Sequence, residues 1–295
     1  MTMQATRQSL GDARWHFQHG PIDIVLQADG PPAVVDLAVA QAWQVFETVL
    51  PTLVQELPAL RAPVLSPLGV GLQGPVARRM WQTAQDAAWA APDGFVTPMV
   101  AVAGAVAQAV LQALAQPGIE RAYVNNGGDI ALHLAPGQSW RLGLVSDVQA
   151  ALASDLHSDW VLDGAFSITH DLPVRGVATS GWRGRSFSLG IADSVTVLAE
   201  TAAQADVAAT LIANAVNLEH PDIVRRPANS LRDDTDLGGR LVTVDVPRLP
   251  RAWVARAVQL GLDCAHAMQQ RGQLYAAFLC CQGQVAVAQP LESWV

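Results

Sequence analysis

The chain has few charged residues and few cysteines, and both shortages narrow its class. Charged residues make up only 15% of its 295 positions, whereas 51% are hydrophobic. A chain this apolar is typical of a globular protein with a large core and not of a disordered one. The net charge of −8 gives no basic excess for non-specific binding of nucleic acid or of an anionic membrane surface. We therefore expect neither nucleic acid nor a membrane as a partner.

The three cysteines, Cys264, Cys280 and Cys281, show no CxxC pair and no zinc-binding spacing. Two of them lie in the apolar run "AAFLCC", which is typical of buried thiols in a reducing compartment. The N-terminal residues lack the apolar core of a signal peptide. The most apolar segment, 98–115, is interrupted by glutamines and falls short of the ~18–20 residues that a membrane span needs. We expect a soluble, cytoplasmic protein.

Several common catalytic signatures are also missing. The histidines show neither HxxxH nor HExxH spacing, and no GxSxG nucleophile motif occurs. Neither a Walker loop nor a Rossmann glycine fingerprint is present. The chain also contains no tandem repeat and no low-complexity tract. These motif-defined enzyme classes are therefore not indicated.

The hydrophobic pattern mixes helical and strand-like segments without a regular βαβ rhythm, which favours an α+β fold over a doubly wound sheet. Helices are predicted over about 32–60, 75–91, 98–115, 202–217 and 250–271. Strands are predicted within 14–28 (as a pair joined by a turn), 121–125, 129–134, 140–146, 166–169, 174–181, 193–199, 240–246, 274–280 and 284–288. The polar stretch 146–164 is interpreted as a variable loop or hairpin.

The order strand, glycine turn, strand and then helix occurs in both halves of the chain. We therefore expect one domain over 1–295, built from two intimately packed α+β subdomains of about 1–135 and 136–295, with mixed or antiparallel sheets. The helix 98–115 is rich in Ala, Val and Gly, and such small residues let neighbouring elements approach its backbone closely. This predicts a core position for that helix.

Thr97 followed by Pro98 marks the start of the same helix. A threonine side chain at the N-cap accepts a hydrogen bond from the first turn, and proline suits the first helical position. The sequence therefore predicts that Thr97 caps this helix.

The segment "YVNNGGDIAL" places poor strand formers inside a strand-like run. Asn126, Gly127, Gly128 and Asp129 allow two interpretations. One is a tight hairpin turn, for which Asn-Gly is a strong local signal. The other is a glycine loop whose bare backbone lets a ligand pack against it. Asp129 supports the second interpretation, because a carboxylate entering an apolar strand is costly unless it has a partner.

A second candidate site follows the strand 174–181. Thr179, Ser180 and Gly181 offer hydroxyls and turn amides, and Arg183 and Arg185 add two cations close by. Guanidinium groups and turn amides suit phosphate oxygens. The alternative is a solvated arginine loop that pairs with the surplus acidic residues. Both interpretations stay open at this point.

The helix 202–217 carries a third candidate site. Asp206, Thr210 and Asn214 are spaced to lie on one face, opposite the apolar one. In one interpretation Asp206 caps the first turn and Thr210 faces water. In the other, a carboxylate and a hydroxyl one turn apart offer hard oxygen ligands to Mg²⁺, which needs few protein ligands beside substrate phosphates.

In this order, the three motifs resemble the ApbE family, Mg²⁺-dependent flavin transferases that move FMN from FAD onto a threonine of a target protein. The segments "YVNNGGDIAL", "VATSGW" and "SVTVLAETAAQADVAATLIANAV" are similar to that family's glycine, ATSG and SVTV…ADALAT motifs, over about 95–217. The resemblance implies an ApbE-like fold. It also implies that Asp206 and Thr210, with the carbonyls of Ala209 and Ala103, hold Mg²⁺.

The resemblance further implies that 126–129 and 179–181 line a pocket for FAD or a related dinucleotide. The family's His-x-x-Asp-Pro-x-Thr-Gly segment is absent between the second and third motifs, which indicates a compact ApbE-like branch. Arg183 and Arg185 are expected to replace phosphate contacts of that segment. Their alternative role is contact with a partner protein.

Three hypotheses about function follow. The first is Mg²⁺-dependent binding of FAD or a similar dinucleotide, with flavin transfer to a protein acceptor or pyrophosphate cleavage. The second is a flavin-, pterin- or nucleotide-binding protein that kept the fold and lost transfer chemistry. The third is a structural or assembly protein in which the glycine segment is a simple turn. Homodimerisation is left open.

Overall fold

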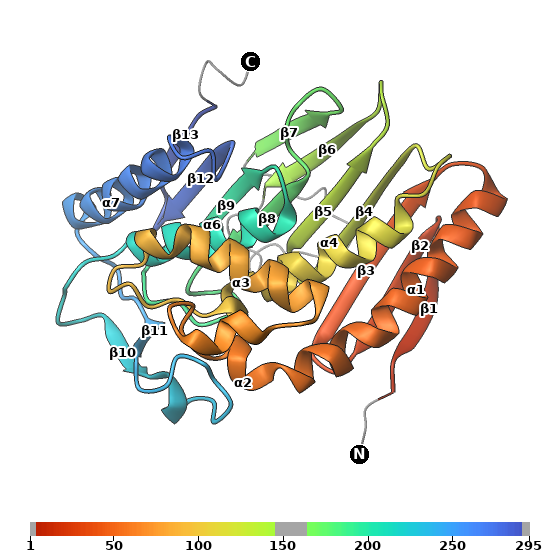
Figure 1. Ribbon diagram of the computed structural model, residues 1–295. Helices are drawn as coiled ribbons and strands as arrows, with labels where there is room; N and C mark the ends of the chain where they lie inside the picture. The colour runs from red at the N-terminus through yellow and green to blue at the C-terminus, as the bar shows by residue number, and fades with distance from the viewer. Residues whose placement is uncertain (1–3, 145–163, 291–295) are drawn as a thin grey trace.

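A nine-stranded antiparallel sheet dominates the computed structural model, which describes residues 4–144 and 164–290 (Figure 1). The strand order across this sheet is β1-β2-β3-β4-β5-β8-β9-β12-β13. The strands are β1 (Thr6–Gly11), β2 (Arg14–His19), β3 (Ile22–Asp29), β4 (Arg121–Asn126), β5 (Asp129–Leu134), β8 (Gly176–Ser180), β9 (Ser194–Ala199), β12 (Ala276–Cys281) and β13 (Gln284–Ala288).

Two smaller sheets accompany it. One pairs β6 (Ser139–Leu144) with β7 (Gly164–Thr169), and the other pairs β10 (Val224–Pro227) with β11 (Leu241–Asp245). Every strand pairing in the described residues is antiparallel. The α+β class with antiparallel sheets is therefore confirmed.

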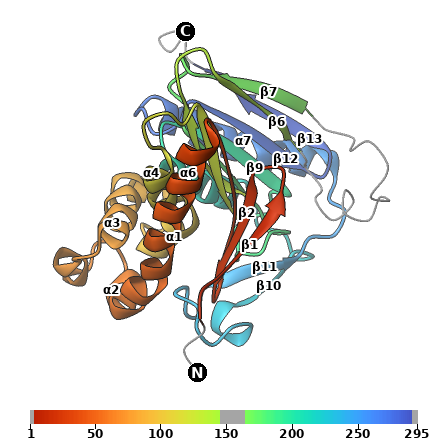
Figure 2. The same cartoon turned by 90° about the vertical axis from the view of Figure 1, so that its right-hand side faces the viewer.

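The helices gather on one face of the large sheet (Figure 2). They are α1 (Pro32–Gln55), α2 (Leu57–Leu60), α3 (Pro75–Ala87), α4 (Val102–Leu114), α6 (Ala202–Ala215) and α7 (Arg251–Gln269). Short 3₁₀ turns are η1 (Pro67–Gly71), η2 (Ala88–Ala90), η3 (Pro98–Ala101) and η4 (Ala228–Ser230). The predicted core position of 98–115 is confirmed, since most of α4 is buried.

The main core lies between this sheet face and the helices. In β3, every second residue from Ile22 to Ala28 is buried, which is the two-residue period of a strand. In α1, the buried residues recur every three or four positions, from Ala38 through Phe46 to Leu53. The apolar face of β3 and the apolar face of α1 therefore both belong to the main core between the sheet and the helices.

The helix α1 is long and apolar enough to cross a membrane, judged by length and composition alone. Here it packs along α4, β2 and β3. The core helix of a soluble protein and a signal sequence can each be as long and as apolar as this helix. The expectations of no membrane partner and of a cytoplasmic location therefore stay predictions.

The β6–β7 sheet covers part of the opposite face of the large sheet (Figure 2). A second apolar cluster fills the space between them and includes Leu132, Val177 and Leu198 from the large sheet and Ile168 from β7. Phe166 stacks on Phe278 with ring centroids 5.9 Å apart. The large sheet therefore has a helical face and a partly sheet-covered face.

The structure corrects several local predictions. Strand β1 and the short strand β10 were not predicted. Thr97 occupies the N-cap position, but its side chain accepts no capping bond; its hydroxyl donates to Asp236 instead, and the helix opens with the 3₁₀ turn η3. The stretch 146–164 lies almost wholly outside the described residues.

The large sheet is continuous across the predicted boundary between subdomains. Ile130 of β5 pairs with Val177 of β8, and Ala131 pairs with Gly176. The strands before 135 and after it thus share one ladder. The division into two subdomains stays a prediction.

Candidate functional site

The glycine segment forms the hairpin turn between β4 and β5. Asn126 pairs with Asp129, so Gly127 and Gly128 are the two loop residues, with φ of 70° and 115°. The Asn125 side-chain oxygen accepts a hydrogen bond of 2.9 Å from the Gly128 N–H. Only glycine adopts this pair of conformations without strain. The hairpin interpretation is therefore correct for the local structure, and whether a ligand lies against it is a separate question.

Strand alternation sorts the predicted site residues between the two faces of the sheet. Asn126, Asp129 and Ser180 lie on the helical face of the sheet, because each is two residues from a residue of the main core on the same strand. These core residues are Val124, Ala131 and Ala178. Thr179 lies on the other face with Val177, where its hydroxyl hydrogen-bonds Thr196 at 2.8 Å. Only the Thr179 backbone reaches the first group, through a hydrogen bond to the Asp129 carboxylate.

Asp206 links α6 to α4. Its carboxylate accepts a 2.9 Å hydrogen bond from the Gly104 N–H. The side chain does not cap α6, because Thr201 is the N-cap and accepts from the Gln204 N–H at 3.3 Å. The capping interpretation of Asp206 is therefore wrong. A buried carboxylate in the second turn faces a neighbouring helix instead.

Gly104 makes this contact sterically feasible. A Cβ at that position would lie 2.3 Å from the Ala202 carbonyl oxygen and 2.9 Å from the Asp206 Cβ. The sequence indicated close approach in this helix but not the partner. Neighbouring Ala103 carries the carbonyl predicted as a metal ligand, and this oxygen accepts a 3.1 Å hydrogen bond from the Asn126 side-chain amide.

Asp129 and Asp206 are electrostatically coupled carboxyl groups. Burial raises the pKa of Asp206 well above its ordinary value, and the neighbouring Asp129 raises this pKa further. Burial also raises the pKa of Asp129 to about 7, against the opposing effects of the Thr179 backbone and Arg185. Two acids from motifs far apart in the chain thus share one weakly solvated space.

Hydroxyl groups lie beside these acids. The Thr210 hydroxyl donates to the Ser180 hydroxyl at 3.4 Å, joining α6 to the end of β8. Gly181 follows directly and is also packed closely, since a Cβ there would lie 2.3 Å from the Asp193 carbonyl oxygen. Ala209 is buried inside α6, where each carbonyl accepts the helix's own hydrogen bond.

The two arginines of the loop after β8 have different surroundings. The Arg185 guanidinium lies against the turn, 2.2 Å from where a Cβ of Gly127 would be, and it interacts with Asp129. Arg183 forms a 3.1 Å ion pair with Asp193 instead. Of the two, Arg185 lies at the carboxyl pair.

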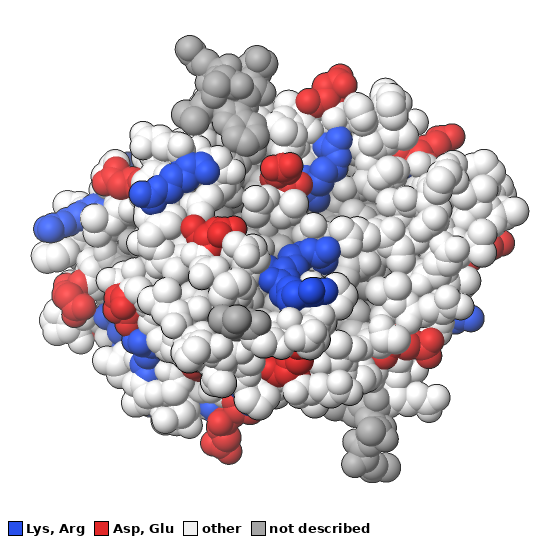
Figure 3. Space-filling view, viewed as in Figure 1, with Lys and Arg blue, Asp and Glu red and all other residues white. Residues whose placement is uncertain are grey.

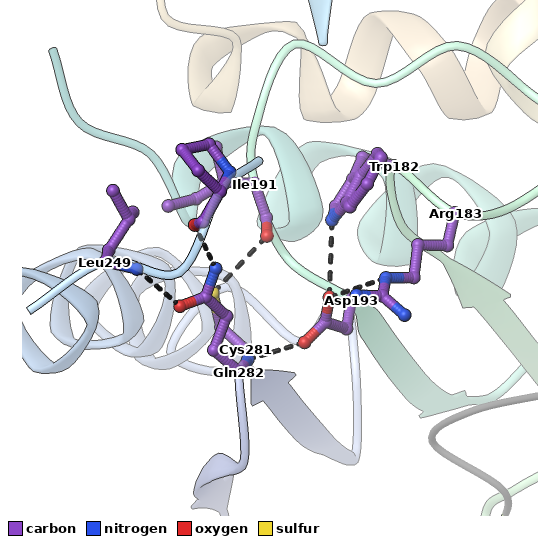
Figure 4. Close-up of polar contacts among 8 residues, drawn as sticks. Trp182, Arg183, Ile191, Asp193, Leu249, Cys281 and Gln282 are labelled. Atoms are coloured by element: carbon purple, nitrogen blue, oxygen red, sulfur yellow. Dashed lines mark hydrogen bonds and ion pairs between the residues drawn. The ribbon is translucent and has the colours of Figure 1, made fainter. Parts of the chain in front are cut away.

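Asp193 connects this loop to the turn between β12 and β13 (Figure 4). Besides Arg183, its carboxylate accepts hydrogen bonds from the Trp182 indole at 3.3 Å and from the Gln282 N–H at 2.5 Å. The side chain of Asp193 is only 13% exposed. Sequence reasoning missed this residue, because its partner Gln282 lies in a turn near the end of the chain.

The chain is thus an antiparallel α+β protein, and its two coupled carboxyl groups, Asp129 and Asp206, lie where α6 packs on β5. The chain matches the family described as AbpE bacteria over residues 5–287, and it belongs to that family. The expected ApbE-like branch is thereby confirmed.

Curated relatives are archaeal UPF0280 proteins. The one from Methanothrix thermoacetophila is 34% identical over 148 residues, covering 50% of this chain and 56% of the relative. The one from Methanospirillum hungatei is 32% identical over 169 residues, covering 56% and 64%. The chain thus spans less than two thirds of the length of these relatives.

Solved structures similar to this chain include the apo flavinyl transferase ApbE of Pseudomonas stutzeri, with a TM-score of 0.45 and 14% identity over 98% of this chain and 94% of that one. A variant of the flavin transferase ApbE from Vibrio cholerae gives a TM-score of 0.46 and 10% identity, with both chains fully covered.

Proposed function

We propose that this chain binds FAD or a similar dinucleotide together with Mg²⁺ and cleaves the nucleotide, or transfers its flavin part, at the pyrophosphate. The observation that carries the proposal is the carboxyl pair of Asp129 and Asp206. Two repelling acids, Asp206 buried and Asp129 half-buried, are stabilised by a cation between them. Membership of the ApbE-like family supports flavin nucleotide handling.

The donor set fits Mg²⁺ chemically. Carboxylates of Asp129 and Asp206 and hydroxyls of Thr210 and Ser180 are hard oxygen donors, the type that this ion prefers. Within the described residues, no group of three or more His, Cys, Asp or Glu side chains is placed to hold a metal ion. The proposed donors are therefore two carboxylates and two hydroxyls, and the rest of the Mg²⁺ shell would come from water and substrate phosphates.

Each residue then has a definite task. When bound, Mg²⁺ neutralises negative charge on the pyrophosphate. Asp206 holds its side of the site in place through the Gly104 N–H, and Asn126 ties the hairpin to α4 through the Ala103 carbonyl. Arg185, beside Gly127, offers a guanidinium fork to phosphate oxygens. Arg183 contributes less, because Asp193 already engages it.

The test is isothermal titration of the protein with FAD, with and without Mg²⁺, followed by chromatography for released FMN. Asp206→Asn keeps an oxygen for the Gly104 N–H but removes the charge, and Asp36→Asn on the exposed side of α1 is the matched control. We expect Mg²⁺-dependent binding that Asp206→Asn weakens at least tenfold and Asp36→Asn leaves unchanged. FAD binding that changes neither with Mg²⁺ nor with Asp206→Asn would contradict the proposed metal site.

The second candidate is a protein that binds a flavin, pterin or nucleotide and performs no transfer. Its supporting observation is the loop after β8, where Trp182, Arg183 and Asp193 bind one another. That loop occupies the position of the family's histidine-containing segment in the sequence. Its Trp182 and Arg183 side chains contact Asp193 and so stabilise the loop itself. Tight binding without FMN release, with candidate acceptor proteins present, would favour this candidate over the first.

A further inference from the structure

A cavity of about 430 Å³ lies among α3, α4, α6 and the end of α7. This volume is within the range of small-molecule sites in proteins. Gln204 and Val207 of α6 line the cavity, whereas Asp206 between them turns to α4. The cavity is therefore separate from the carboxyl pair. Basic side chains gather near the middle of the helical face, over α3 and α4 (Figure 3).

Arg79 of α3 lines this cavity without a carboxylate partner among the described residues. Its guanidinium donates to two neutral acceptors, the Gln112 side-chain oxygen at 3.0 Å and the Ala105 carbonyl at 3.4 Å. Burial lowers the pKa of Arg79, which reports the cost of keeping this charge away from water. A half-buried guanidinium of this kind is stabilised by an anion that reaches it.

Gln108 of α4 contributes a hydrogen-bond acceptor to the same wall of the cavity. Its side-chain oxygen is buried and has no hydrogen-bond partner in the part of the chain that the structure describes. A buried acceptor without a partner has lost its hydrogen bonds to water and gained none in return. A ligand that brings a hydroxyl or amine donor would satisfy it. Thr201 and Gln204, at the start of α6, place the positive end of the helix dipole in the same wall.

The charge of the cavity wall changes from positive to negative along α3. Arg79, Thr83 and Asp86 follow one another at helical spacing, so Arg79 and Asp86 lie about 10 Å apart along the axis. Asp86 repels an anion at its own end. The anionic group of a ligand therefore belongs at the Arg79 end. Arg271 lies at the rim, stacked on Trp89 with its guanidinium carbon 3.6 Å from the ring centroid.

We propose that this cavity binds a small hydroxylated organic anion, with its phosphate or carboxylate against Arg79 and a hydroxyl donor toward Gln108. Phosphate and carboxylate present the same planar pair of acceptor oxygens to a guanidinium fork. The site is independent of the dinucleotide proposal, because neither Asp129 nor Asp206 contributes to it.

The experiment is isothermal titration of the full chain with three probes, namely inorganic phosphate, glycerol 3-phosphate and malate, at fixed ionic strength set by sodium chloride. Arg79→Gln removes the charge, and Thr83→Phe fills the cavity while leaving Arg79 in place. The matched control is Arg78→Gln, the exposed neighbour that does not line the cavity. Circular dichroism verifies that each variant is folded.

We expect glycerol 3-phosphate or malate to bind the unaltered chain and the Arg78→Gln variant equally, and inorganic phosphate to bind more weakly because it brings no carbon-bound hydroxyl. Arg79→Gln should weaken binding at least tenfold, as expected for loss of a charge-assisted pair. Thr83→Phe should abolish binding, and it decides the matter if Arg79→Gln fails to fold. The proposal would be overturned if none of the three probes gave measurable binding to the unaltered chain. Equal affinity of the Arg78→Gln and Arg79→Gln variants would overturn it as well.

Discussion

Replacing Gly104 by alanine tests the close contact of α4 with α6. The new Cβ would lie 2.3 Å from the Ala202 carbonyl oxygen, a backbone atom that cannot rotate away. Ordinary contact begins near 3.4 Å, so the two helices must separate by about 1 Å. Overpacking of this kind costs about 1–3 kcal/mol. Separation also weakens the hydrogen bond from the Gly104 N–H to Asp206, a further ~1 kcal/mol.

Helix propensity opposes this cost, because alanine is favoured over glycine by about 1 kcal/mol in a helix interior. The expected net loss in the free energy of unfolding is therefore about 1–3 kcal/mol. For a chain of 295 residues, this lowers the melting temperature by roughly 2–5 °C. Urea and thermal unfolding followed by circular dichroism measure both quantities.

The matched control is Gly239→Ala, where a Cβ would meet no atom within 4 Å and φ is not positive. That variant should change stability by less than about 0.5 kcal/mol. If Gly104→Ala were as stable as Gly239→Ala, the contact between α4 and Asp206 would be looser than described. The close-approach argument would then fail.

Two further predictions concern Asp129 and Asp193. In metal-free protein, the free energy of unfolding should fall as pH rises from about 4 to about 7, because burial raises the pKa of Asp129 to about 7 and the folded state keeps a proton that the unfolded state has lost. Asp129→Asn should reduce this slope in urea titrations at several pH values without abolishing it, because burial also raises the pKa of Asp206; an unchanged slope would refute the assignment. Asp193→Ala should cost about 2–3 kcal/mol, because Trp182 and Gln282 lose their acceptor. A loss no larger than that of Asp36→Asn in the same unfolding assay would show that the Asp193 contacts are weak.

Most of the secondary structure could be predicted because its signals are local. The alternation in β3 and the three-to-four residue period in α1 can be recognised from a few neighbouring residues. Strand β1 has no such signal, since all six of its residues are exposed. Thr97 shows the limit of a local rule: a distant carboxylate, Asp236, competes successfully for its hydroxyl.

The candidate site could be predicted only as separate motifs. The sequence indicated the glycine segment, the strand end before Trp182 and the helix with Asp206, and the structure brings parts of all three together. It did not indicate that Thr179 would face the other side of the sheet, or that Asp193 would engage Arg183 and leave Arg185 beside the turn. The cavity at Arg79 gave no recognisable sequence signal, since its lining comes from several helices.

By itself, the sequence determined the α+β class, the turn signal at Gly127–Gly128 and the helical spacing of Asp206 and Thr210, because each depends on residues a few positions apart. Only the tertiary structure decided which groups meet. The Gly104 N–H and the Asp206 carboxylate are 102 positions apart in the chain. Their contact depends on the antiparallel strand order and on which face each side chain takes, and these are properties of the whole sheet and its helical layer.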